Sequence, residues 1–252
     1  QPVYYPFSEV ITDNGREVVS NDLVLTEDGT YKIDFADFEQ KIIANGIKLF
    51  LLCSPHNPVG RVWTREELET IGDICVKHGV TVVSDEIHND FIWEGTHTVF
   101  AGIKKEFADI SVTCTSPSKT FNLASMLISN IFIPNQILRR KFRKEMDRAG
   151  ISQLSVLGLV ATEAAYAHGD EWYAAMKNYV RDNIVFARAY VEENLPGVRM
   201  IDTQGTYLIW LDFRQTGLTV EQLDHKIIYE AGLWLDSGKI FGKTGEGFER
   251  IN

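Results

Sequence analysis

Polar side chains that can do chemistry follow three apolar runs of the chain, at the point where each run ends. They are Asn57 after residues 47–53, Asp85 and His88 after residues 80–84, and Ser116, Ser118 and Lys119 after residues 109–115. Ligands of open α/β sheets bind at the carboxyl ends of the strands. If the three runs are neighbouring strands, we expect an amide, a carboxylate, an imidazole, hydroxyls and a primary amine to converge there.

Together these groups match a cofactor that carries an aldehyde, a ring nitrogen, a phenolic oxygen and a phosphate. The Lys119 amine would condense with the aldehyde. The Asp85 carboxylate would keep the ring nitrogen protonated, which makes the ring an electron sink. The Asn57 amide and the His88 imidazole could hydrogen-bond the phenolic oxygen, and serine hydroxyls could hold the phosphate. We therefore predict pyridoxal 5′-phosphate as the cofactor.

Each of these residues also has a structural interpretation. An exposed lysine is the default, and an aspartate or asparagine after a strand commonly belongs to a turn. Ser116 and Ser118 are typical turn formers, and His56 is assigned a structural role. Glu86 is expected to point away from the site of Asp85, because side chains alternate along a strand. The chemical interpretation therefore depends on the whole set rather than on one member.

The elements that must position these groups alternate between strands and helices. Residues 47–53 and 80–84 are apolar runs of the kind expected for strands buried on both faces. Between them, residues 64–79 have a helical pattern, with Thr64 as N-cap and Glu67 completing a capping box. Such strand–helix–strand units predict an α/β fold with a mainly parallel sheet.

The rest of the chain is predicted to add strands to this sheet, then helices, then a smaller α+β part. The strands are residues 109–115 and 126–133, the helices are 135–147, 152–168 and 170–194, and the last part has a strand at 205–213 and a helix at 219–231. We predict three regions: a large cofactor-binding domain (1–165) without its N-terminal portion, a connecting helix (166–195) and part of a small C-terminal domain (196–252).

Composition narrows the class of protein. The 252 residues include 35 acidic and 25 basic side chains, and the net charge of −10 disfavours nucleic acid or an anionic membrane as the main partner. No apolar run is long enough to span a bilayer. Cys53, Cys75 and Cys114 form no C-x-x-C pair, so we expect reduced thiols of a cytoplasmic protein and no metal site.

Three segments carry a family resemblance. "CSPHNPVGRVW" (53–63), "VVSDEIHNDF" (82–91) and "SPSKTFNLA" (116–124) resemble the signature segments of fold-type I, class I/II aminotransferase-like enzymes, which depend on pyridoxal phosphate. The details are similar to the branch of cystathionine β-lyases and other carbon–sulfur β-lyases, which reads "SDEIH" and "SK[ST]FN". The resemblance extends from residue 1 to residue 252, and it implies the aspartate aminotransferase-like fold.

The resemblance implies a role for each matching residue. Lys119 matches the lysine that links to the cofactor, Asp85 the partner of the ring nitrogen, and Asn57 the donor to the phenolic oxygen. The other matches are His88, where many aminotransferases have a tyrosine; Ser116 and Ser118, on the phosphate side; Tyr4, which stacks on the cofactor ring; and Arg250, which grips the substrate carboxylate. A small amino-acid substrate and a homodimer are implied as well.

The implied activity is β-elimination from cystathionine or related S-substituted cysteines. An aminotransferase is the first alternative, because both reactions use the same residues near the lysine. Leu127 stands where many aminotransferases have a phosphate-binding arginine, a departure that the β-lyase branch shares. A non-catalytic or regulatory protein on the same fold is a further alternative, although Lys119, Asp85 and Asn57 are all present.

The ends of the chain suggest that it is cut. It begins without methionine and stops inside a predicted strand. The resemblance implies a preceding third of the family's chain, which carries a glycine-rich phosphate loop and a residue for the partner's site. We therefore expect a chain truncated at both ends.

Overall fold

The computed structural model describes residues 1–151 and 153–252, which form two compact units. Unit 1 comprises residues 1–45, 56–62 and 179–252, and unit 2 comprises residues 46–55 and 63–178. Ser152, the predicted first residue of a helix, lies outside the described residues. None of the helices in the described part of the chain is long and apolar enough to cross a membrane.

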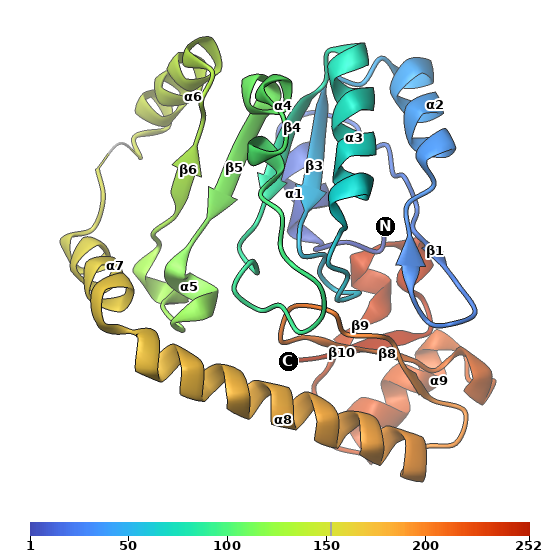
Figure 1. Ribbon diagram of the computed structural model, residues 1–252. Helices are drawn as coiled ribbons and strands as arrows, with labels where there is room; N and C mark the ends of the chain where they lie inside the picture. The colour runs from blue at the N-terminus through green and yellow to red at the C-terminus, as the bar shows by residue number, and fades with distance from the viewer. Residues whose placement is uncertain (152) are drawn as a thin grey trace. The chain divides into compact units, whose positions relative to one another are not determined.

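Unit 2 is built on a sheet with the strand order β3-β4-β5-β6. The strands are β3 (Leu49–Cys53), β4 (Thr81–Asp85), β5 (Ser111–Thr115) and β6 (Asn130–Phe132). β3, β4 and β5 run parallel, and β6 is antiparallel to β5 (Figure 1). The predicted α/β class with a mainly parallel sheet is therefore confirmed, and β6 is the exception because the short segment after β5 turns the chain back.

Three helices of unit 2 lie where the sequence predicts them, with shifts of their ends: α3 (Arg65–His78), α6 (Gln136–Ala149) and α7 (Val156–His168). The short helices α4 (Lys105–Ile110) and α5 (Pro117–Thr120) were not predicted. The predicted strand 109–115 begins two residues late, at Ser111, because Asp109 and Ile110 complete α4. The predicted strand 126–133 is likewise shorter, because a 3₁₀ turn at Ala124–Met126 precedes it.

Helix α3 forms where its local sequence predicts it. The Thr64 hydroxyl accepts a hydrogen bond from the Glu67 backbone N–H (3.2 Å), and the Glu67 carboxylate accepts one from the Thr64 N–H (2.8 Å). This capping box satisfies two N–H groups that lack partners within the helix. Gly79 ends the helix at φ +63°, a conformation that favours glycine. Gly72 lies against the Phe107 ring of α4 so closely that a Cβ would be 2.2 Å from it.

Helix α8 (Asp170–Asn194) matches the predicted range 170–194, and its residues divide between the two units at position 178. Unit 1 contains an antiparallel sheet with the strand order β7-β8-β10-β9. Its strands are β7 (Arg199–Met200), β8 (Ile209–Asp212), β10 (Phe248–Ile251) and β9 (Asp236–Ser237). α9 (Val220–His225) and a π-helical turn (Lys226–Glu230) together cover the helix predicted at 219–231.

The core of unit 1 contains side chains from both the N-terminal and the C-terminal segments of the chain. The rings of Trp210 and Phe248 stack with centroids 5.1 Å apart, and Tyr31 and Val59 are buried in the same cluster. The N-terminal elements of unit 1 are α1 (Pro6–Asp13), β1 (Val24–Leu25), β2 (Tyr31–Lys32) and α2 (Phe35–Asn45). The two compact units have other boundaries than the predicted domains, and they are defined by contacts within this chain. The predicted domain boundaries at residues 165 and 195 stay a prediction.

Candidate active site

The carboxylate and the amine of the predicted site both belong to unit 2, at the carboxyl ends of adjacent strands. Asp85 is the last residue of β4, opposite Cys114 of β5, and Lys119 lies on α5 directly after β5. The Asp85 carboxylate accepts a hydrogen bond from the Ile87 backbone N–H (3.2 Å). Burial raises the pKa of Asp85, while the positive charge of Lys119 acts to lower it. The charge of Lys119 is therefore felt at the Asp85 carboxylate, while the roles assigned to both residues stay a prediction.

The short helix α5 holds Lys119 in a fixed turn. The Ser116 hydroxyl accepts a hydrogen bond from the Ser118 N–H (3.0 Å) and donates one to the Ile128 carbonyl oxygen (2.6 Å). Ser116 is buried and acts as the N-cap of α5, whereas Ser118 is half-buried. The phosphate-side role assigned to both serines stays a prediction, and the hydroxyl of Ser116 is already engaged in the cap.

Two further residues follow β4 and have different surroundings. His88 is buried, and its carbonyl oxygen accepts from the Phe91 N–H (3.0 Å) in the turn after the strand. Glu86 is fully buried and accepts hydrogen bonds from the Ser84 hydroxyl (2.8 Å), His97 Nε2 (2.9 Å) and a backbone N–H (3.1 Å). These bonds engage the Glu86 carboxylate in fixing residues 97–100, in line with the expectation that Glu86 lies outside the site.

In unit 1, Arg250 of β10 contacts another of the predicted residues. Its Nη1 donates to Asn57 Oδ1 (2.9 Å), and its Nε and Nη2 donate to Asp236 Oδ2 (3.1 and 2.5 Å). The guanidinium also lies 4.7 Å from the centre of the Phe241 ring. The oxygen of the buried Asn57 amide accepts this bond from Arg250. The nitrogen of the same amide, Nδ2, is the atom that can donate hydrogen bonds.

Tyr4 belongs to the same unit, just before α1. Its ring centre lies 5.7 Å from that of Tyr5 and 6.0 Å from that of Phe7. Burial raises the pKa of Tyr207, and the positive charge of the nearby Arg250 acts to lower it. Tyr4 lies near the same Tyr207 phenol.

His56 has the structural role expected of it. Its Nε2 donates to the Pro2 carbonyl oxygen (2.8 Å), and its backbone N–H donates to the Arg61 carbonyl oxygen (2.8 Å).

In the described part of the chain, no group of three or more His, Cys, Asp or Glu side chains is arranged to hold a metal ion.

The comparison with protein families decides the identity of the fold. The model of the family described as aminotransferase class I and II matches residues 1–252. The chain belongs to this family. The expected resemblance to this family is therefore confirmed.

Individual relatives point to one branch of the family. The chain is 44% identical to cystathionine β-lyase PatB of Bacillus subtilis, over all of this chain and 65% of that protein. It is 40% identical to cystalysin of Treponema denticola, a structure that contains pyridoxal 5′-phosphate, with a TM-score of 0.97 over 100% of this chain and 64% of that one. A pyridoxal phosphate-bound C–S lyase of Staphylococcus hominis is 34% identical, with a TM-score of 0.91 over 100% and 64%. The chain thus spans slightly less than two thirds of these relatives.

The structure also reveals partners that the sequence analysis missed. Asp236 was not predicted, although it faces Arg250 across the β9–β10 pair and binds its guanidinium. Asp90 and Thr120, which are hydrogen-bonded to each other, were not singled out either. Asp90 and Thr120 lie inside the motif segments 82–91 and 116–124, and this was their only local signal. A contact between residues distant in the chain leaves no periodic pattern in the sequence.

Proposed function

We propose that the protein is a pyridoxal phosphate-dependent carbon–sulfur β-lyase. It would convert cystathionine or a related S-substituted cysteine, with water, into pyruvate, ammonia and a thiol. The observation that carries this proposal is that Asp85 and Lys119 follow or end the neighbouring strands β4 and β5 at the same edge of the sheet. The names of the relatives PatB and cystalysin support the lyase over the other reactions of the family.

The donor and acceptor groups of the chain fit this cofactor. Burial opposes the ionisation of Asp85, so its carboxylate favours a cationic neighbour such as a protonated ring nitrogen. The donor end of the Asn57 amide suits a phenolic oxygen. The remaining roles follow the resemblance: Lys119 would form the covalent link, His88 would lie beside the phenolic oxygen, Ser116 and Ser118 would face the phosphate, and Tyr4 would stack on the ring.

The catalytic work of the chain falls mainly on Arg250 and on Lys119, which would act as a neutral amine. Arg250 would hold the substrate α-carboxylate, because its planar fork matches a carboxylate in a bidentate way. Asp236 would orient that fork from the opposite side. The Lys119 amine would act as the general base that removes the α-proton of the substrate. When bound, pyridoxal phosphate supplies the sink for the electron pair left at the α-carbon.

An aminotransferase is the second candidate function, and the description of the family itself favours it. Both reactions begin with removal of the α-proton and use the same lysine and aspartate. They differ in whether a thiolate leaves from the β-carbon or the amino group is passed on to an oxo-acid. We further propose a homodimer in the cytoplasm that acts on small amino acids.

Cystathionine without any added oxo-acid tests the proposal. Elimination regenerates the starting form of the cofactor, so pyruvate should accumulate over many turnovers. Lys119→Arg, which keeps the charge, should abolish this accumulation. A single burst of product equal to the enzyme concentration, with turnover restored only by 2-oxoglutarate, would establish the aminotransferase instead.

A further inference from the structure

A hydrogen bond joins the two segments that carry the proposed catalytic pair. Thr120 is the residue after Lys119 and ends α5, and Asp90 lies five residues after Asp85 in the turn that follows β4. The Thr120 hydroxyl donates to Asp90 Oδ2 at 2.6 Å. Thr120 is only 2% exposed and Asp90 is half-buried, so this bond is partly shielded from competing water.

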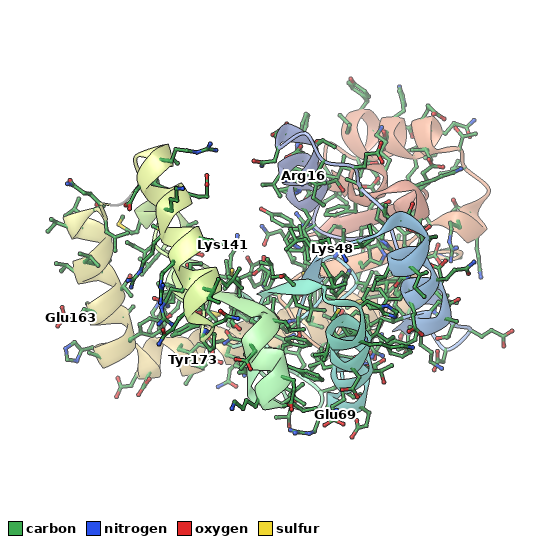
Figure 2. The ribbon with its side chains drawn as sticks, turned by 90° about the horizontal axis from the view of Figure 1, so that it is seen from above. Arg16, Lys48, Glu69, Lys141, Glu163 and Tyr173 are labelled. Atoms are coloured by element: carbon green, nitrogen blue, oxygen red, sulfur yellow. The ribbon has the colours of Figure 1, made fainter. Side chains whose placement is uncertain are left out.

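The Asp90 end of this bond is itself fixed. The Tyr173 hydroxyl donates to the Asp90 carbonyl oxygen (2.5 Å), and Lys177 Nζ donates to the Tyr173 hydroxyl (3.2 Å). Tyr173, labelled in Figure 2, lies on the part of α8 that belongs to unit 2. The turn after β4 is also closed by the bond from the Asn89 N–H to the Glu86 carbonyl oxygen (3.0 Å). These bonds fix the backbone around Asp90, whose carboxylate accepts the bond from Thr120.

The other side of Thr120 is held by packing. The ring of its neighbour Phe121 lies 5.9 Å from the ring of Tyr166 on α7, and 6.0 and 6.3 Å from those of Trp172 and Tyr173 on α8. At the start of α5, the Ser116 cap fixes the turn. The backbone of Lys119 is thus held on both sides. In addition to the pairing of β4 with β5, the Thr120–Asp90 bond links the residue after Lys119 to the turn that follows the strand of Asp85.

We propose that Asp90 and Thr120 are positioning residues, which set the place of the Lys119 amine relative to the Asp85 carboxylate. This inference rests on the proposed function, because it assumes that Lys119 and Asp85 act on one bound cofactor. Proton transfer demands that the reacting atoms lie within hydrogen-bond reach of each other. A shift of α5 after loss of the bond would slow the chemistry and leave recognition of the substrate carboxylate by Arg250 intact.

The test compares matched variants of the protein reconstituted with pyridoxal 5′-phosphate. Thr120→Val removes the hydroxyl at nearly constant volume, Thr120→Ser restores it, and Asp90→Ala removes the acceptor. Asp90→Asn keeps an acceptor oxygen if Asp90→Ala fails to fold. Thr70→Val is the control, because the Thr70 hydroxyl donates only to the Glu66 carbonyl oxygen of its own helix (2.9 Å). The readouts are kcat, KM, thermal unfolding and the rate at which borohydride-fixed cofactor appears on Lys119.

We expect Thr120→Val and Asp90→Ala each to lower kcat and the rate of fixation about ten- to a hundredfold, with little change in KM, because a misplacement of about 1 Å can cost on the order of a hundredfold. The double variant should be no worse than either single one, because both remove one bond. Thr120→Ser should recover most of the loss, and Thr70→Val should lose nothing.

Two results would overturn the inference in distinguishable ways. If Thr120→Val unfolds at a lower temperature but keeps normal kcat and normal fixation well below that temperature, the bond only stabilises the fold. The proposed function would then stand, and the positioning role would not. If borohydride fixes no cofactor on Lys119 of the unsubstituted protein, the proposed function fails first, and the positioning role fails with it.

Discussion

Asp85 has a proposed role in the chemistry, and its buried carboxylate also lowers the free energy of unfolding when it is ionised. The carboxylate is held at the end of β4, where burial raises its pKa and the neighbouring Glu86 raises it further. A carboxyl group whose pKa is raised in the folded state favours folding less as the pH rises, because the native form must carry a buried charge. The penalty is absent in acid and is complete above the raised pKa. A protonated ring nitrogen would offset it.

Replacing Asp85 with Asn should therefore change activity and stability in opposite directions. We expect turnover to fall at least about tenfold, because a charge-assisted bond contributes roughly 1.5–3 kcal/mol. Without cofactor, the variant should unfold at a higher urea concentration than the parent at neutral pH and at nearly the same concentration in acid. Near-normal turnover would exclude the proposed role of Asp85.

Arg250 offers a second test at the scale of a single side chain. Lysine keeps the charge but cannot make the forked contacts of the guanidinium to Asn57 and Asp236. Arg250→Lys should raise KM for the amino-acid substrate about ten- to a hundredfold, since the loss of charge-assisted bonds is on the order of 1.5–3 kcal/mol. The effect on kcat should be smaller.

A matched control for this substitution exists in the same unit. Arg214 also makes a forked contact, from Nε and Nη2 to the two oxygens of Asp212 (2.8 and 2.7 Å), but it has no proposed role in the site. Arg214→Lys should leave KM unchanged. If both substitutions raise KM equally, the effect does not support the proposed carboxylate-binding role of Arg250.

At the scale of elements, the termini of α3 show how local sequence determines a helix. Thr64→Ala would remove the hydroxyl that accepts from the Glu67 N–H and leave that donor without its cap. The loss should lower the free energy of unfolding by about 1 kcal/mol, the usual contribution of such a cap. Urea unfolding would measure it, with Thr70→Ala as a control at an interior position of the same helix. Because alanine has the higher helix propensity, Thr70→Ala should lose no stability from that source, and an equal loss in both variants would mean that other contacts of the threonine side chains, not capping, are responsible.

Elements with strong local signals could be predicted almost to the residue. Helix α8 was expected at 170–194 and occupies that range, and the ends of α3 follow from Thr64 and Gly79. Elements that depend on distant pairing could not be predicted as well. β7, at Arg199–Met200, exists because it pairs with β8. The segment 1–45 was left without assigned elements: its strands are two residues long, and its helices α1 and α2 were missed as well.

The same distinction applies to the candidate site. Lys119, Asp85 and Asn57 could be identified because they stand in short, contiguous motifs. Asp236 could not, because its relation to Arg250 depends on the register of β9 and β10. The bond between Thr120 and Asp90 likewise joins positions 30 residues apart in the chain. Motifs therefore predict which groups do the chemistry, while the groups that orient them emerge only from the fold.

At the scale of the whole molecule, the excess of acidic residues is not confined to the surface. The net charge is −10, and each unit contains a carboxyl group whose pKa is raised by burial: Asp85 in unit 2 and Glu249 in unit 1. Glu249 is 1% exposed, and burial raises its pKa to about 7, with Asp224 adding to the rise and Lys239 acting against it. Both groups make the protein less stable as the pH rises.

Glu249→Gln should remove much of this pH dependence from unit 1. The unfolded carboxyl titrates near 4.5 and the folded one near 7, so the destabilisation is absent below the first value and complete above the second. At pH 8 the variant should exceed the parent in free energy of unfolding by up to about 3 kcal/mol, and at pH 4.5 the two should be nearly equal. Glu246→Gln, at an exposed position nearby, serves as the control and should change little at either pH. Urea titrations of the three proteins at both pH values would measure this, and an advantage of Glu249→Gln that is the same at pH 4.5 and pH 8 would show that packing, rather than a buried charge, separates the variant from the parent.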